Sequence, residues 1–477
     1  MKNRAHCNNP ARRCLAGIAV ALGFLLSLNH ATAQGGVPAL TDRLSKVIPD
    51  KMIATGVPGM VVVLLADGVP VWTRAFGFAD LETGRAMPPD ALFRVESISK
   101  PVTAWGAMRL ATTGRLDLDA PISDCLTDWH PPMGLPAITT RQLLSNTAGV
   151  GLGDYGARYA PNEVRPDLAA YLTEDFLMIG RPGTRFAYSD TGFNLVELEI
   201  EVCTASDFAD LMRKEVLLPL GMDGASYAWT GLQMPVGHDL RGQPVPPYVY
   251  PGRASGGLHA TAADIARFAA AGMGGAKQTV LPPHAVAEMH HSLIEVGGLF
   301  GLAADGYGLG HFTEMLSDGR AAVWHGGQGY GWMSHLHMVP ETGDGIVILA
   351  NSQRAWPLFA AILRDWSESL GVAPVGMARV LWAGTAARVA IGILAAVTAL
   401  ILWAALGGRP LGSAVRIGLG IMAVPLLLWP LRAATAEYLF LFSILPALWP
   451  WLAASSGLAG LGLGALALTP VRVRQGI

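Results

Sequence analysis

The stretch FRVESISKPVTAWGAMRL, residues 93–110, contains a Ser-x-x-Lys sequence formed by Ser97 and Lys100, in a chain with only six lysines. Residues three apart lie on one face of a helix, so the Lys100 amine is expected one turn behind the Ser97 hydroxyl. Unpaired N–H groups and the positive end of the dipole at a helix start favour negative charge near Ser97. Because serine is a weak nucleophile without a base beside it, the pair indicates acyl-transfer chemistry.

Two later motifs supply the other groups that this chemistry needs. Residues 182–195, PGTRFAYSDTGFNL, contain Tyr188 and Asp190, and residues 323–334, VWHGGQGYGWMS, contain His325. In order and flanks the three motifs resemble those of the penicillin-recognising serine hydrolases, especially the class C β-lactamase, esterase and D-peptidase branch. There they run Ser-x-x-Lys, Tyr-x-Asn, then Lys-Thr-Gly or His-x-Gly. The resemblance covers about residues 40–370.

The resemblance implies a role for each side chain. Ser97 would attack a carbonyl to give an acyl-enzyme, with Lys100 as the base. Since the ordinary lysine pKa is about 10.4, Lys100 must be desolvated or lie near other cations to act in this way. Tyr188 would pass a proton to the leaving group and later help to activate water. His325, which can be neutral at working pH, would hydrogen-bond Tyr188 or the substrate.

The backbone of the third motif is expected to bind the reacting carbonyl. Gly326 and Gly327 carry no side chain and would let a strand edge approach the acyl group closely. By resemblance, the N–H groups of Gln328 and Ser97 form an oxyanion hole, which stabilises charge that develops in the transition state.

Asp190 stands where the family usually has Asn. Its carboxylate can bond Lys100 but only accepts hydrogen bonds, and its charge would favour protonated Lys100. Asp190 also precedes a helical stretch and is a candidate N-cap. A neutral His325 instead of a lysine, together with Asp190, weakens binding of anionic, amide-bearing substrates. The two changes predict hydrolysis of short-chain esters or small amides in preference to penicillins and cephalosporins.

Strand-like segments lie at both ends of residues 34–375, with helical ones, such as 168–178 and 193–206, between them. Residues 59–80 predict a hairpin around Asp67-Gly68. Residues 321–331, 334–340 and 345–352 read as strands, followed by a helix at 357–370. The pattern predicts an α/β (α+β) domain, and the resemblance implies a β-lactamase/transpeptidase-like antiparallel sheet flanked by helices, with an inserted helical subdomain and the active site between the two.

The two ends of the chain have different compositions. Residues 1–33 are basic, then apolar, and end in Ala31-Thr32-Ala33, which predicts a secretory signal peptide cleaved after Ala33. A retained anchor is the alternative, although its apolar run is shorter than the ~20 residues of a spanning helix. Residues 376–477 contain Glu437 as their one acidic residue, against seven arginines.

Three apolar stretches in this tail, 389–406, 417–431 and 438–468, predict an all-α transmembrane region of about three helices. Two or four spans remain open, and a soluble helical domain fits poorly with such sparse charge. Three spans place the catalytic domain on the periplasmic or extracytoplasmic side, with Arg409, Arg416, Arg472 and Arg474 inside, in agreement with the positive-inside bias.

Charge and motif content exclude several function classes. The net charge of −2 combines two basic ends with a strongly acidic middle, so nucleic acid is not expected as a partner. No metal or organic cofactor is expected, because His284, Glu288, His290 and His291 match no His-Glu-x-x-His pattern. The cysteines of the exported part, Cys125 and Cys203, form either a disulfide or two separate buried thiols.

The sequence therefore predicts a membrane-anchored serine hydrolase that acts on an ester, amide or β-lactam carbonyl of a small-molecule or peptide substrate. A D-Ala-D-Ala-type carboxypeptidase or D-peptidase is an alternative within the same chemistry. A non-catalytic, penicillin-binding-like sensor module is the alternative from another class.

Overall fold

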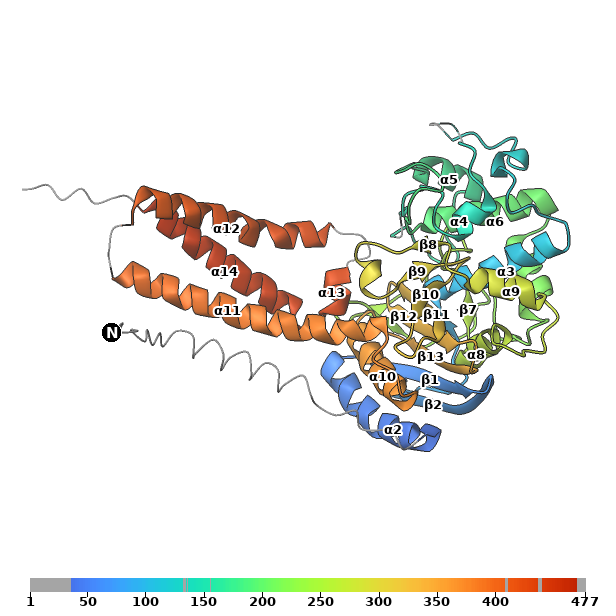
Figure 1. Ribbon diagram of the computed structural model, residues 1–477, viewed down its shortest axis with the longest axis horizontal. Helices are drawn as coiled ribbons and strands as arrows, with labels where there is room; N and C mark the ends of the chain where they lie inside the picture. Colours follow the sequence, from blue (N-terminus) through green and yellow to red (C-terminus); the bar gives the residue numbers. More distant parts are fainter. Residues whose placement is uncertain are drawn as a thin grey trace, which may run out of the picture.

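The structure, a computed structural model, describes residues 36–131, 134, 136–154, 156–407, 411–435 and 440–469. The predicted signal peptide lies outside the described residues. Within them, the main sheet is antiparallel and nine-stranded, in the order β3-β2-β1-β13-β12-β11-β10-β9-β8 (Figure 1). Its strands are β1 (Gly59–Ala66), β2 (Val69–Asp80), β3 (Arg85–Ala86), β8 (Ile294–Glu295), β9 (Gly306–Tyr307), β10 (Phe312–Met315), β11 (Ala321–Gly329), β12 (Trp332–Val339) and β13 (Asp344–Ala350).

The centre of this sheet joins the two ends of the catalytic domain. The predicted hairpin is confirmed: Asp67 and Gly68 both have positive φ, 53° and 73°, as a two-residue type I′ turn between β1 and β2 requires. On its other side β1 pairs with β13, Val61 opposite Leu349. Strands predicted near opposite ends of the domain are therefore neighbours.

Strand β1 is apolar throughout because both of its faces are buried. Successive side chains point to opposite faces, so Val61 and Val63 enter one core while Val62 and Leu64 enter the other. The first core lies under the helical part of the domain and the second under the terminal helices. The helices concerned are α3 (Ser99–Thr112) and α8 (Ala262–Ala271) on the first face, and α2 (Gly36–Thr55) and α10 (Trp356–Ser369) on the second.

The helical subdomain is inserted between β3 and β8, as predicted (Figure 1). The two predicted helices correspond to α5 and α6, and short two-stranded pairings join the subdomain internally. Its further elements are η1 (Glu96–Ile98), η2 (Ile122–Asp124), α4 (Thr140–Leu144), α5 (Leu168–Asp175), α6 (Asp190–Thr204), α7 (Phe208–Met212), η3 (Arg213–Leu217), α9 (Pro283–His290) and strands β4 (Phe93–Arg94), β5 (Gly237–His238), β6 (Pro244–Val245) and β7 (His259–Ala260).

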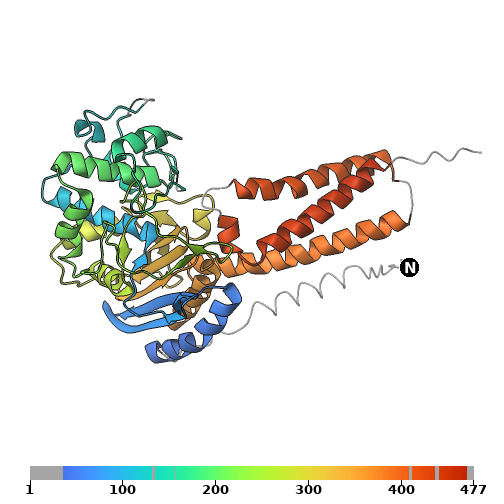
Figure 2. The same cartoon turned by 180° about the vertical axis from the view of Figure 1, so that it is seen from behind.

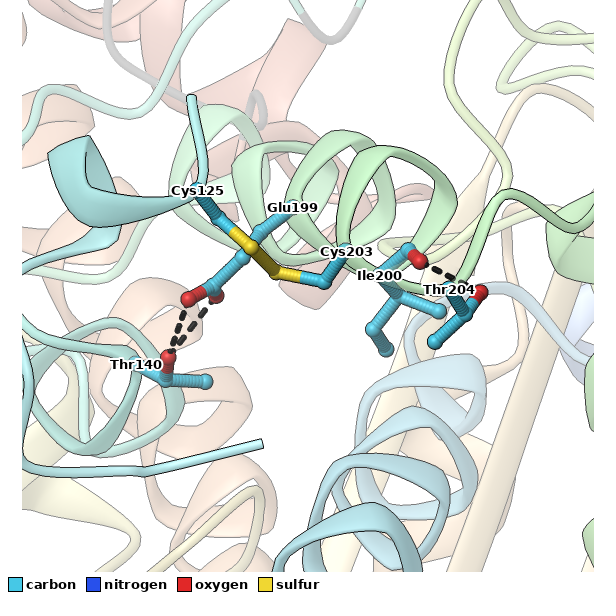
Figure 3. The surroundings of a disulfide bond; sticks show 6 residues. All are labelled: Cys125, Thr140, Glu199, Ile200, Cys203 and Thr204. Atoms are coloured by element: carbon cyan, nitrogen blue, oxygen red, sulfur yellow. Dashed lines mark hydrogen bonds between the residues drawn. A yellow bond between two sulfur atoms is a disulfide. The ribbon is translucent and has the colours of Figure 1, made fainter. Parts of the chain in front are cut away.

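A disulfide decides between the two alternatives for the cysteines. Cys125 follows η2 and Cys203 lies in the last turn of α6, and their Cα atoms are 5.6 Å apart across the bond (Figure 3). The bond closes a chain segment with a sequence separation of 78. In the loop-entropy model a cross-link over such a segment stabilises the fold by about 4 kcal/mol. Disulfides persist in oxidising compartments, so the bond indicates an extracytoplasmic domain.

Three long apolar helices follow the catalytic domain and project from one end of it, as both views show (Figures 1 and 2). Gly376–Leu406, Ser413–Ala434 and Trp449–Leu468 are long and apolar enough to cross a membrane. The predicted third stretch is a kinked pair, broken near Pro446. The tail comprises η5 (Gly376–Arg379), α11 (Val380–Leu406), α12 (Ser413–Ala434), α13 (Phe440–Ile444) and α14 (Trp449–Leu468).

Glu199, beside the disulfide, makes stability depend on pH (Figure 3). Burial raises the pKa of Glu199 to about 7, and the Thr140 hydroxyl, 2.7–2.8 Å from both carboxylate oxygens, opposes the shift. Because the folded pKa exceeds the unfolded value, the stabilisation is complete below about pH 4.5 and is lost as pH rises through 7. Between pH 5 and pH 8 the wild type should lose about 2.5 kcal/mol of unfolding free energy through this group, and we expect Glu199→Gln to remove that loss.

The measurement is thermal unfolding of the full chain in detergent across this pH range, with Glu174→Gln, at an exposed position on α5, as the control. The wild type and the control should lose stability in parallel as pH rises, whereas Glu199→Gln should stay level. An equally steep loss in Glu199→Gln would show that Glu199 does not carry this pH dependence.

Candidate active site

Ser97 and Lys100 meet as their spacing predicts. Ser97 lies in the single turn η1, which leads directly into α3, and Lys100 lies in the first turn of α3. The Nζ atom of Lys100 is 3.2 Å from the Oγ atom of Ser97. Lys100 is fully buried, while Ser97 retains 7% exposure and lines two cavities. The hydroxyl is therefore accessible from a cavity and the amine is not.

Asp190 binds Lys100, but it is not the N-cap of α6. Ser189 is the N-cap: its hydroxyl accepts a hydrogen bond from the Gly192 N–H, and Asp190 is the first residue of the helix. The expectation of an Asp190 cap is therefore wrong, because the preceding serine already occupies that position. The Asp190 carboxylate instead lies 2.5 Å from Lys100 Nζ.

The charge state of Lys100 is set by opposing effects. Burial lowers the pKa of the Lys100 amine, whereas the nearby carboxylates of Asp190 and Glu96 raise it. Burial prevails, and the net shift is downward. A third contact, from Nζ to the Ser255 carbonyl oxygen at 2.9 Å, fixes the amine in place. The expected effect of Asp190 on Lys100 is present, but it does not outweigh desolvation.

Tyr188 lies beside the same pair. Its phenol hydrogen-bonds Ser97, and burial raises the pKa of Tyr188 well above its usual value, with the Asp190 charge adding to the rise. The Lys100 Nζ atom lies 4.8 Å from the centre of the Tyr188 ring. Tyr188 is therefore a neutral phenol at neutral pH, able to relay a proton rather than to hold a standing negative charge.

His325 is buried behind the site rather than lining it. Its Nδ1 is 2.8 Å from the Gly326 carbonyl oxygen, which can only accept, so Nδ1 carries the proton. The Nε2 atom then accepts from the hydroxyl of Tyr307 at 3.3 Å. Burial lowers the pKa of His325 well below its usual range, and the Lys100 charge adds to this effect. The ring is neutral and contacts Tyr307, a partner that the sequence did not indicate.

The glycines of β11 let the sheet contact the turn that carries Ser97. A Cβ at Gly327 would lie 2.4 Å from the Val95 carbonyl oxygen, and one at Gly329 would lie 2.1 Å from the Glu96 carboxyl carbon. A Cβ at Gly326 would meet the Trp356 ring at 2.8 Å. Glycine is therefore required at these positions by contacts of β11 with other parts of the protein. The expectation that glycine is needed for contact with an acyl group is not tested by this geometry.

Glu96 is a part of the site that the sequence analysis missed. It precedes Ser97 and has φ of 50°, in the left-handed region that residues other than glycine seldom adopt. Its buried carboxylate accepts hydrogen bonds from Arg94 Nε at 3.1 Å and from two tyrosine hydroxyls, Tyr248 at 3.1 Å and Tyr250 at 2.8 Å. These contacts hold the strained turn. In the sequence, the one signal for a role of Glu96 in the site is its position directly before Ser97.

Ser97 and Gln328 are shared by two cavities of different character. The first, of about 480 Å³, has a polar lining that includes Asp190, Asn194 and Tyr250. The second, of about 170 Å³, is lined mainly by apolar side chains. Gln328 is held by its side-chain oxygen, which accepts from Trp356 Nε1 at 2.6 Å.

The histidine and glutamate side chains of α9, which were considered as metal ligands, contact other residues. Glu288 lies 2.5 Å from Arg141, and His290 packs against His311 with ring centres 4.9 Å apart. His290 is half-buried, and burial lowers its pKa well below its usual value, with the His311 charge adding to the effect. Among the residues that the structure describes, no group of three or more His, Cys, Asp or Glu side chains is arranged to hold a metal ion.

Fold and site together define a serine hydrolase of the β-lactamase-like class. The sequence profile of the Beta-lactamase family matches residues 44–365, and the chain belongs to this family. It is 26% identical over 328 residues to penicillin-binding protein 4 of Amycolatopsis lactamdurans, covering 65% of this chain and 84% of that protein.

Two further similarities extend the comparison. Esterase EstB of Burkholderia gladioli is 34% identical over 128 residues, which span 26% of this chain and only 33% of the esterase. The structure of the octameric penicillin-binding protein homologue from Pyrococcus abyssi superposes with a TM-score of 0.61 at 25% identity, covering 70% of this chain and 78% of that one. The relatives thus include esterase and penicillin-binding proteins.

The opposing effects on Lys100 generate a prediction for Asp190→Asn. Removing the carboxylate removes an interaction that raises the Lys100 pKa, so that pKa should fall further. If the neutral amine is the active form, the acidic limb of kcat/KM against pH, measured with 4-nitrophenyl acetate, should move to lower pH. Asp154→Asn, which changes another carboxylate of the polar cavity, is the control and should leave the limb in place. A limb that moves to higher pH in Asp190→Asn would contradict the argument.

Proposed function

We propose that this protein is a membrane-anchored serine hydrolase that cleaves carboxylic esters through an acyl-enzyme on Ser97. The observation that carries the proposal is the 3.2 Å contact between Ser97 Oγ and a fully buried Lys100 amine whose pKa is lowered. A desolvated amine beside a cavity-facing hydroxyl is the arrangement that makes serine nucleophilic. The family membership supports the same chemistry.

In the first half-reaction the Ser97 oxygen bonds the substrate carbonyl carbon while its proton passes to neutral Lys100. The negative charge that develops on the carbonyl oxygen is stabilised by the backbone N–H groups of Ser97 and Gln328. The carbon–oxygen bond to the leaving group then breaks, and that group departs with the electron pair. Tyr188, hydrogen-bonded to Ser97, relays the proton from Lys100 to it.

In the second half-reaction water replaces the leaving group. It attacks the acyl carbonyl, gives its proton to the Lys100–Tyr188 pair, and displaces Ser97, which regains a proton. Asp190 and the Ser255 carbonyl position Lys100 in both steps. His325, Gly326 and Gly327 act from β11: the histidine holds Tyr307, and the glycines let the strand lie against the turn before Ser97. The proposed steps require no metal or organic cofactor.

We further propose that residues 1–33 are a signal peptide, residues 34–375 the catalytic domain and residues 376–477 the membrane region. The catalytic domain would then lie on the periplasmic or other extracytoplasmic side. The disulfide between Cys125 and Cys203 and the three apolar helices support this arrangement. Arg416, at the end of α12 remote from the domain, donates to the Ala467 carbonyl oxygen at 2.8 Å and fits the cytoplasmic end of a positive-inside bundle.

The proposed chemistry predicts covalent labelling of Ser97. A fluorophosphonate probe should label the full chain in detergent and fail to label Ser97→Ala, while Ser206→Ala, at an exposed position, labels normally. Lys100→Ala and Tyr188→Phe should each reduce ester turnover by about 10²-fold or more, the usual scale of acid–base contributions. Lys214→Ala, also at an exposed position, is the matched lysine control. A Lys100→Ala/Tyr188→Phe double variant with wild-type turnover would contradict these two roles, whereas a wild-type chain that is labelled at Ser97 but turns over no ester would favour the sensor alternative.

The substrate preference follows from charge. A neutral, buried His325 offers no fixed positive charge for a β-lactam or cell-wall peptide carboxylate. The arginines of the polar cavity, Arg158 and Arg241, are exposed, and exposed charges bind a carboxylate weakly. Since a charge-assisted hydrogen bond contributes roughly 1.5–3 kcal/mol, kcat/KM for 4-nitrophenyl acetate should exceed that for a chromogenic cephalosporin by about tenfold or more.

Ser97→Ala should abolish both activities, which checks that a single site is measured. A D-alanyl-D-alanine peptide assayed in parallel separates the carboxypeptidase alternative. Efficient cephalosporin or D-peptide hydrolysis with little esterase activity would overturn the ester assignment.

The proposed topology predicts the fate of a C-terminal tag. With three spans the tag lies inside, so external protease should digest the catalytic domain of intact cells and leave the tag protected. Permeabilised cells, in which both are digested, are the control. A tag that is cleaved in intact cells would contradict the three-span arrangement.

A further inference from the structure

The apolar cavity at Ser97 extends to the membrane helices. Its lining includes Ser97, Tyr188 and Gln328 of the site, and also Val380 and Ala383 of α11. Both α11 residues belong to the candidate span Gly376–Leu406. Ile444 of α13, in the segment between α12 and α14, also lines it. A single cavity of about 170 Å³ thus connects the reactive hydroxyl with the membrane region.

The wall formed by α11 is fixed to the catalytic domain. The Gly376 N–H donates to the Glu314 carboxylate at 2.8 Å, and Arg379 donates to the Leu302 carbonyl oxygen at 2.8 Å. A Cβ at Gly376 would lie 2.2 Å from the Ala303 carbonyl oxygen, so the two segments are in direct backbone contact. These contacts place the start of the membrane helix against the loop that borders the cavity.

The lining of this cavity suits a hydrocarbon chain. Aromatic rings cover one side: Tyr188 stacks on Phe300 with ring centres 5.0 Å apart, and Phe300 stacks on Phe312 at 5.7 Å. Among the residues that the structure describes, the lining contains no acidic side chain, and the cation in it, Arg379, is bonded to the Leu302 carbonyl. Leu299 and Leu302, which also line it, are 62% and 61% exposed beside the start of α11. Such leucines are stable in contact with lipid.

The other cavity at Ser97 has a larger share of polar and charged lining. It is larger, about 480 Å³, and its lining carries the charged side chains of Asp154, Arg158, Asp175 and Asp239. Because Ser97 belongs to both linings, a carbonyl bound there has an apolar space on one side and a polar space on the other. A substrate that matches both is amphiphilic.

We propose that the enzyme takes amphiphilic lipid esters, with the hydrocarbon chain in the cavity bordered by α11 and α13 and the polar part in the charged cavity. This inference rests on the proposed ester hydrolysis at Ser97 and specifies its substrate class. The chain enters from the bilayer along α11, and cleavage of the ester bond adds water, giving a carboxylic acid and an alcohol. The inferred substrates therefore have longer hydrocarbon chains than the short-chain esters predicted from the sequence.

The experiment uses the full chain in lipid nanodiscs with 4-nitrophenyl esters of two, four, eight and twelve acyl carbons. Burial of each methylene strengthens binding by up to about fourfold, so kcat/KM should rise at least tenfold from the acetyl to the octanoyl ester. Ala383→Phe fills the cavity and should reduce the dodecanoyl-to-acetyl ratio of kcat/KM by tenfold or more. Ala386→Phe, an exposed position on the same helix outside the lining, is the matched control and should keep the wild-type ratio.

A second arm separates this inference from the reaction itself. Ser97→Ala, which cannot turn over, should still bind a fluorescent fatty acid of eleven or twelve carbons, and Ala383→Phe in that background should weaken binding at least tenfold. Dodecyl acetate compared with ethyl dodecanoate shows whether the chain belongs to the alcohol or the acid. Equal kcat/KM at all chain lengths, or a ratio unaffected by Ala383→Phe while Ser97 labels normally, would overturn the lipid assignment. Failure of Ser97 labelling with intact fatty-acid binding would overturn only the proposed hydrolysis.

Discussion

The site depends on the burial of one amine. Lys100 is fully buried, and its Nζ contacts Ser97 Oγ, Asp190 and the Ser255 carbonyl. A buried ammonium is very costly unless it is paired, whereas a buried neutral amine costs much less and needs only hydrogen bonds. The segments that carry Asp190 and Ser255 must therefore pack against the start of α3. Asp190 then lies near enough to bind the Lys100 amine, and burial still keeps the pKa of that amine low.

Strand β11 packs closely against the turn that precedes Ser97, because two of its residues there are glycines. Gly327 and Gly329 let β11 contact Val95 and Glu96 directly, and Glu96 holds its left-handed conformation because Arg94, Tyr248 and Tyr250 bind its carboxylate. Strain of this kind costs of order 1–3 kcal/mol and persists only where surrounding contacts enforce it. The core of the sheet thus stabilises the turn from which Ser97 reaches the cavities.

The C-terminal helices, which are candidate membrane spans, also contribute to the site in this structure. Residues of α11 and α13 complete a cavity that includes Ser97, and hydrogen bonds from Gly376 and Arg379 hold the first span against the domain. Separating the helices from the domain would open the apolar cavity to water. The apolar helices and the preceding domain are therefore in direct contact at the site, although composition alone indicates two unlike parts.

Motif spacing and hydrophobic periodicity were sufficient for much of this protein. The Ser97–Lys100 contact, the Asp67-Gly68 hairpin, the helices around 168–178 and 193–206 and the three apolar helices follow from local rules, since each depends on residues close in sequence. Tertiary structure alone decided the rest. Whether Cys125 meets Cys203, whether Ser189 or Asp190 caps α6, which tyrosine His325 contacts and how Glu96 is held depend on segments far apart in the chain. Burial and pairing across such distances set the energies of those groups, and no local pattern encodes them.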